Sequence, residues 1–158
     1  MGLASIFQNH DVLQRGLPLP IWWRGKAGEC TSVQLAGHNA QAEVDNTGHW
    51  LLRILAISPR GTYELGVQTP SDAVRVSDIL VGGVWLCSGQ SNMEWRSEQT
   101  AAEWAMDTPD LPRVLLLTIT AAACLGRTDS VDGSWKLCTA ESIPRAPIST
   151  TKNCELNL

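Results

Sequence analysis

A short run of small and polar residues at positions 88–92 holds the best candidate for chemistry. It follows a nine-residue apolar stretch from Ile79 to Cys87. A stretch of that length and composition predicts a strand buried on both faces, as in a parallel sheet. Open α/β sheets place ligands at the carboxyl ends of such strands. A serine on that turn, with a helix behind it, combines an exposed hydroxyl with N–H groups that stabilise an oxyanion, so Ser91 is the candidate nucleophile.

A plain structural turn is the alternative, because small polar turns commonly follow strands. The nucleophile elbow of α/β-hydrolases, Gly-x-Ser-x-Gly, is not met here. Met93 stands where the second glycine would be. Spacing alone leaves both interpretations of the turn open.

The longer segment from Val84 to Trp95 is more specific than any short motif. Its twelve residues, VWLCSGQSNMEW, resemble the first catalytic block of the sialate O-acetylesterase family, a group of SGNH hydrolases. The resemblance implies that Ser91 is the nucleophile and that its backbone N–H is one oxyanion donor. The neighbouring motif residues would support it: Gly89, Gln90 and Asn92. The implied activity is a serine carboxylic ester hydrolase that removes O-acetyl groups from sialic acids or other acetylated sugars, with no metal and no cofactor.

Residues 1–77 are predicted to form a β-sandwich-like module. Apolar and polar residues alternate along several short segments that are separated by Gly, Pro or Asn. The positions predicted to point into the core are Val33, Leu35, Ala40, Ala42, Val44, Tyr63, Leu65 and Val67. The segments 9–16, 61–65 and 76–82 also resemble the β-rich module of the same family, and the resemblance covers roughly residues 5–95.

Residues 78–143 are predicted to begin a flavodoxin-like α/β domain of the SGNH hydrolase type. The segment 97–106 is rich in helix formers, and 113–119 is a second apolar run of strand length. Together with the strand 79–87 they predict a βαβ unit with Ser91 at the crest of its first strand. Two strands leave such a domain incomplete. The segment 132–138 resembles a later family segment more weakly. Residues 144–158 lack periodicity and are predicted to be an irregular, disordered tail.

The base that a serine nucleophile needs is missing from the pattern. The histidines, His10, His38 and His49, all precede Ser91 and lie in the predicted sandwich. The Asp-x-x-His segment and the later glycine and asparagine blocks of the family are not found. We therefore expect no histidine within hydrogen-bonding distance of Ser91 and a truncated, inactive form of the esterase. The alternatives are a non-catalytic carbohydrate-binding or interaction module and a truncated product without independent function.

Composition and charge limit the classes of partner that we expect for this chain. The formal net charge is -4 and no run of Lys or Arg occurs, which disfavours nucleic acid and anionic membrane surfaces. Neither a signal peptide nor an apolar segment of transmembrane length is visible, and the compartment stays open. The five cysteines lack zinc-ligand spacing, so we expect no metal, and Cys87 is predicted to be a core thiol. Most of the seven tryptophans are expected to pack. The expected partner is an acetylated sialic acid or another acetylated carbohydrate, and the oligomeric state stays open.

Overall fold

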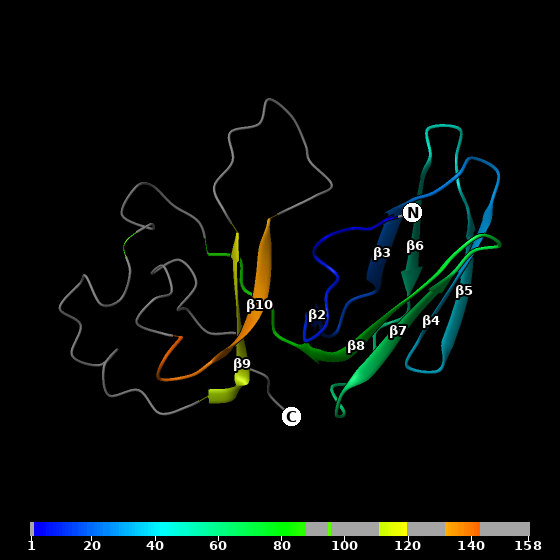
Figure 1. Ribbon diagram of the computed structural model, residues 1–158. Coiled ribbons are helices and arrows are strands. Elements are labelled where there is room, and N and C mark those ends of the chain that lie inside the picture. The colour runs from blue at the N-terminus through cyan, green and yellow to red at the C-terminus, as the bar shows by residue number, and fades with distance from the viewer. Residues whose placement is uncertain (1, 88–94, 96–110, 120–131, 143–158) are drawn as a thin grey trace.

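The computed structural model describes residues 2–87, 95, 111–119 and 132–142, and the regular elements within them are all strands (Figure 1). In chain order the strands are β1 (Gly2–Leu3), β2 (Val12–Gln14), β3 (Leu19–Arg24), β4 (Cys30–Leu35), β5 (His38–Glu43), β6 (His49–Ile54), β7 (Tyr63–Gln68), β8 (Ala73–Gly82), β9 (Leu111–Ile119) and β10 (Gly133–Cys138).

Two sheets share one core. The smaller has the order β1-β3-β6, and the larger has the order β2-β8-β7-β4-β5. All pairings in them are antiparallel except that of β2 with β8, which is parallel. β5 also lies against β6, so the larger sheet curls towards the smaller one at that edge. Inward side chains of both sheets, such as Ile21 and Trp50 from one and Leu35 and Leu65 from the other, belong to a single buried cluster. The arrangement is a small mixed β-sandwich.

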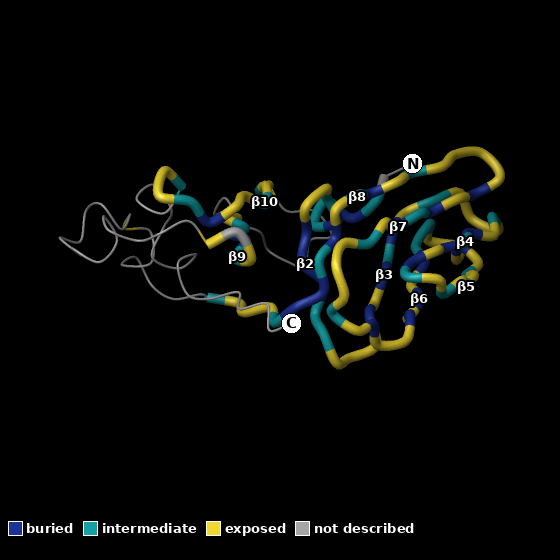
Figure 2. Tube along the Cα trace, turned by 90° about the horizontal axis from the view of Figure 1, so that it is seen from below, coloured by how far each residue is buried: buried dark blue, intermediate teal, exposed yellow. Residues whose placement is uncertain are grey.

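Alternation of side chains explains why these segments form strands. In β6, Trp50, Leu52 and Ile54 are buried while Leu51 and Arg53 are exposed. Figure 2 shows the same succession of buried and exposed positions along β3 and β6. Because a strand presents successive side chains to opposite faces, a period of two places one set in the core.

The core positions predicted for residues 1–77 are confirmed for five side chains and in part for three others. The inward positions that are buried are Val33, Leu35, Val44, Leu65 and Val67, and those that are partly buried against the core are Ala40, Ala42 and Tyr63. Residues 8–77 contain strands, turns and irregular segments and no helix. The first half of the chain is therefore all-β, as predicted.

The predicted buried strand over 79–87 is wrong beyond Gly82. β8 begins earlier, at Ala73, pairs with β7 and β2, and ends at Gly82. The next apolar residues are exposed: Val84 by 39%, Trp85 by 66% and Leu86 by 88%. The apolar run gave no sign of this end, because β8 stops where its partner β2 stops, with Gln14 opposite Gly82. The expected domain boundary at residues 77/78 falls inside β8.

The apolar segment 113–119 does form a strand, β9, but with another partner than expected. β9 pairs antiparallel with β10, and within the described residues it does not pair with β8. The parallel pair of the predicted βαβ unit is therefore not found in this part of the chain. The helix predicted over 97–106 and the tail predicted over 144–158 lie outside the described residues.

Candidate functional site

The predicted nucleophile block lies between described segments. Ser91 and its motif neighbours Gly89, Gln90 and Asn92 all lie outside the described residues. What the structure does give is the segment that leads into the block, from Gly82 to Cys87, and the hairpin β9–β10 that follows it. These two segments are the described parts of the chain that precede and follow the block in the sequence.

The leading segment is held by the end of β2. The backbone N–H of Arg15 donates to the carbonyl of Gly82 at 2.8 Å. The backbone N–H of Val84 donates to Oε1 of Gln14 at 2.9 Å. Cys87 follows three residues later; the prediction that it is a core thiol on the strand is wrong, because it is half-buried and lies beyond the end of β8. Sequence reasoning missed Gln14, because it used the segment 9–16 only as an opening strand.

The hairpin β9–β10 is attached to the amino-terminal segment of the sandwich. Nε2 of Gln8 donates to the carbonyl oxygens of Ser5 at 2.6 Å and of Gly133 at 2.9 Å. The indole N–H of Trp135 donates to the carbonyl of Ile6 at 3.3 Å. These hydrogen bonds between residues far apart in sequence fix β10 beside the segment that precedes β2 (Figure 1).

The three histidines lie in the sandwich, and two of them contact neighbouring side chains there. Nδ1 of His10 lies 3.7 Å from a carboxylate oxygen of Asp78, on the surface. Nδ1 of His49 lies 2.9 Å from Oγ1 of Thr47, and that hydroxyl donates to Asp45 at 2.6 Å in the turn between β5 and β6. His38 is half-buried at the start of β5. The absence of a histidine beside Ser91 stays a prediction.

Hydrogen bonds within that turn also explain the acidity of Asp45. Its Oδ1 accepts from the hydroxyl and the backbone N–H of Thr47 and from the backbone N–H of His49. The hydrogen bond from the Thr47 hydroxyl is the main reason why the pKa of Asp45 lies below its ordinary value. This cluster closes a surface turn and leaves the imidazole of His49 tied to its own hairpin.

Asp11 is a buried acid that the sequence analysis did not single out. It is only 1% exposed, and its Oδ1 has no hydrogen-bond partner in the described part of the chain. Burial raises the pKa of Asp11 to about 7, against an opposing backbone hydrogen bond at Gln8. A sequence signal exists, since Asp11 directly precedes the buried pair Val12-Leu13, but it is weak because acids often flank strands.

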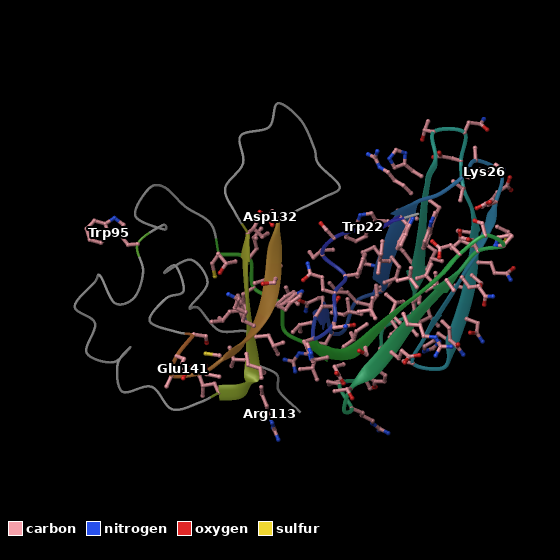
Figure 3. The ribbon with its side chains drawn as sticks, in the orientation of Figure 1. Trp22, Lys26, Trp95, Arg113, Asp132 and Glu141 are labelled. Carbon is pink, nitrogen blue, oxygen red and sulfur yellow. The ribbon has the colours of Figure 1, made fainter. Side chains whose placement is uncertain are left out.

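The exposed tryptophans lie outside the sandwich. Trp23 and Trp50 are buried cross-strand neighbours in the core. Trp22 is half-buried and packs edge-on against Phe7, with 4.9 Å between ring centroids. By contrast Trp85 and Trp95 are 66% and 52% exposed. Figure 3 shows Trp95 far from Trp22. Packing, as expected, is the role of the sandwich tryptophans.

The described residues contain no cluster of three or more His, Cys, Asp or Glu side chains able to hold a metal ion. Among the same residues no helix is long and apolar enough to cross a membrane. The described geometry is a sandwich that is followed by an exposed segment, Val84 to Leu86, which precedes the serine block in the sequence.

Comparisons with known proteins identify the relatives. No protein-family model matches the chain. The sialate O-acetylesterase of Rattus norvegicus is 31% identical over 156 residues, covering 89% of this chain and 29% of the rat protein. The human enzyme of the same name is 28% identical, covering 89% of this chain and 30% of its own length. The crystal structure of a carbohydrate acetylesterase from Xanthomonas citri matches with a TM-score of 0.78 and 28% identity, over 93% of this chain and 34% of that one.

The match extends well beyond the segment 5–95 on which the sequence resemblance rested. The chain nevertheless spans less than a third of the length of the curated relatives that it matches. Agreement of the sequence and of the fold leads to one conclusion: the chain is a homologue of the proteins named sialate O-acetylesterase and of a carbohydrate acetylesterase.

Proposed function

We propose that this chain carries the nucleophile of a carbohydrate O-acetylesterase and the β-module that presents it. The observation that supports this most is the block 84–95, which follows the end of β8 directly and begins with exposed residues. The relatives named sialate O-acetylesterase and carbohydrate acetylesterase give the substrate class, an acetylated sialic acid or another acetylated sugar.

In the proposed reaction Oγ of Ser91 attacks the acetyl carbonyl carbon, and a base accepts the hydroxyl proton. Backbone N–H donors, that of Ser91 among them, stabilise the oxyanion that develops on the carbonyl oxygen. Gly89, Gln90 and Asn92 shape the turn around it. Collapse of the intermediate releases the sugar hydroxyl and leaves an acetyl-serine, which water then hydrolyses to acetate. The chemistry requires neither a metal nor a cofactor.

We propose that the start of an SGNH-type α/β portion follows the sandwich. The sandwich ends at Gly82 in this proposal, five residues later than the expected boundary, because β8 belongs to its larger sheet. The proposed α/β portion then carries the serine block and the hairpin β9–β10 and extends to residue 143. Residues 144–158 form the proposed irregular tail.

We further propose that the 158-residue chain by itself is not an active esterase. A serine hydroxyl is a weak nucleophile near neutral pH without a base within about 3 Å. Among the candidate bases, His10 contacts Asp78 and His49 contacts Thr47, both within the sandwich.

A non-catalytic carbohydrate-binding module is the other candidate. Sugar-binding platforms need exposed aromatic rings, and the sandwich buries Trp23 and Trp50. Its third tryptophan, Trp22, packs on Phe7. The packing of the sandwich therefore does not favour this candidate over the esterase.

The proposed function is tested in a full-length relative of known activity. Replacing the serine that aligns with Ser91 by alanine should abolish acetyl-ester hydrolysis and leave the fold unchanged, because the change deletes one hydroxyl from a turn. Hydrolysis of an O-acetylated sialic acid and the circular dichroism spectrum are measured for both proteins. Turnover retained by the alanine variant would show that another residue attacks the ester.

A further inference from the structure

Gln14 lies where β8 ends, and its side chain replaces a backbone contact there. β2 and β8 are parallel neighbours, and their last matched pair is Gln14 with Gly82. Beyond this pair the two chains separate, although the residues that follow Gly82 are as apolar as those before it. The separation therefore has a local cause.

The pattern of the ladder shows which contact is missing. Hydrogen bonds between parallel strands recur at every second residue of each strand. The N–H of Leu80 donates to the carbonyl of Asp11 at 2.9 Å, and the N–H of Arg15 donates to the carbonyl of Gly82 at 2.8 Å. The next bond of the same series would join the N–H of Val84 to the carbonyl of Arg15.

The carboxamide of Gln14 stands between those two groups. The N–H of Val84 donates to Oε1 of Gln14 at 2.9 Å, and Nε2 of Gln14 donates to the carbonyl of Arg15 at 3.1 Å. A primary amide offers one acceptor and donors in a plane, as a peptide group does, so it can bridge the two strands where they no longer touch. The ladder is widened by one amide, and β8 ends at Gly82.

The residues that follow the widened part of the ladder are more exposed than those before it. Val81, inside the ladder, is 2% exposed, while Trp85 and Leu86 beyond the inserted amide are 66% and 88% exposed. Had the ladder continued directly, this apolar segment would have extended the sheet. Instead it leaves the sandwich with its backbone anchored at Val84.

We infer that Gln14 is a positioning residue, which fixes the point and the direction in which the chain leaves the sandwich for the serine block. Val84 precedes Ser91 by seven residues. The catalytic meaning of this role rests on the proposed function. Gln14 acts through the backbone of Val84 and is not itself a catalytic residue.

A second glutamine of the same amino-terminal segment holds the chain after the block. Gln8 donates from Nε2 to Gly133 at the start of β10 and to Ser5 in its own turn. Trp135 of β10 donates to Ile6 in that segment. Residues 5–15 therefore hold the chain at Gly82 and Val84 before the serine block and at Gly133 and Trp135 after it.

Amide hydrogen exchange, resolved by residue in the full 158-residue chain, tests the role of Gln14. In the Gln14→Met variant the side chain keeps its length and loses both polar atoms. We expect the N–H of Val84 to exchange about 5- to 10-fold faster, the loss that corresponds to one net hydrogen bond. In the Gln14→Glu variant an acceptor remains for Val84 but the donor to the carbonyl of Arg15 is lost, so exchange at Val84 should rise less than in Gln14→Met.

Matched controls separate a local effect from a loss of stability. Gln41→Met changes an exposed side chain on the edge strand β5 and should leave exchange at Val84 unchanged. Exchange in β4 and β7 should not change in either Gln14 variant. An unchanged rate at Val84 in Gln14→Met would overturn the inference. So would an equal loss in Gln14→Glu, or a uniform acceleration that includes β4 and β7.

This result does not depend on whether Ser91 is a nucleophile. If the serine substitution in the full-length relative left hydrolysis intact, the proposed function would fail while the exchange data could still show the anchoring by Gln14. If Val84 exchanged normally in Gln14→Met, the anchoring would fail while the serine result stood. Each experiment can therefore contradict its own proposal without affecting the other.

Discussion

The sandwich and the chain beyond Gly82 bury their apolar residues to different extents. Inward residues of both sheets, such as Ile21, Leu65 and Ile79, are completely covered. In the hairpin, Leu115 and Leu116 are buried, but Ile119 and Leu137 are 44% and 52% exposed. Two sheets can cover each other's inner faces, whereas a two-stranded ribbon has too little surface to close a core. We therefore expect the sandwich to supply most of the stability of the described chain.

The largest expected effect is on the core of the sandwich. Ile79→Ala removes a fully buried side chain and should lower the free energy of unfolding by about 3 to 4 kcal/mol. Leu137→Ala trims a half-exposed side chain on the hairpin and should change it by less than about 1 kcal/mol. Urea unfolding followed by circular dichroism measures both. Equal losses would show that the hairpin and the sandwich form one core.

The sequence predicted the sandwich better than the region after it for a physical reason. Apolar residues that alternate with polar ones, as at Val33 and Leu35 or at Leu65 and Val67, are typical of a strand with one buried face. The pattern therefore predicts both the strand and the side chains that point into the core. The run from Ile79 to Cys87 is apolar throughout, so it has no alternation that could show where the strand ends. Its end depends on β2 and on the side chain of Gln14, which are about 70 residues away in sequence. Composition alone could not show that contact.

The candidate site was predictable only in part. The twelve-residue block pointed to the same name that the most similar curated relatives carry, because a match over twelve consecutive residues is specific. The partner of β9 could not be deduced, since an apolar strand pairs equally well with a parallel or an antiparallel neighbour. Gln8 and Gln14 act through single hydrogen bonds across more than 60 residues. Contacts of that kind leave no periodic signal.

The buried Asp11 should make the stability of the sandwich depend on pH. The pKa of Asp11 is about 7 in the folded protein, above the value of an unfolded chain, so the folded state binds more protons between about pH 4 and about pH 7. Stability should therefore fall as the pH rises through that window. The shift of about three pKa units corresponds to at most about 4 kcal/mol, and we expect roughly half of it after local relaxation.

Asp11→Asn removes this titration without changing the shape of the side chain. The variant should be more stable than the native chain at pH 8, by about 2 kcal/mol, and the two should be equally stable near pH 4. Thermal or urea unfolding at a series of pH values measures the difference. A native chain that is most stable at pH 8 and a variant that is weaker at every pH would contradict the burial argument for Asp11.

The third and smaller effect tests the hairpin by itself. A Cβ at position 133 would clash with the carbonyl oxygen of Thr118, which is fixed backbone. Gly133→Ala should therefore disturb the pairing of β9 with β10 at a cost of about 1 to 2 kcal/mol. Hydrogen exchange should accelerate in the hairpin and stay unchanged in β4 and β7.

Gly66→Ala is the matched control within the sandwich. A Cβ there would meet the side chain of Gln34 at 3.9 Å, an ordinary contact. Exchange should be unaffected or slightly slower, because alanine restricts the unfolded chain more than glycine does. If Gly133→Ala accelerated amide exchange in β4 and β7 as well, the hairpin and the sandwich would unfold together and would not differ in stability.

All three histidines lie in the sandwich, whereas Ser91 lies in the region beyond Gly82. The most direct test of the account therefore asks whether Ser91 has a base. Purified 158-residue chain and its Ser91→Ala variant are compared in the hydrolysis of p-nitrophenyl acetate at neutral pH. We predict equal rates, because we expect no histidine of the sandwich to reach the hydroxyl of Ser91 and act as its base. A rate that clearly depends on Ser91 would contradict this, and it would show that the chain completes its own catalytic machinery.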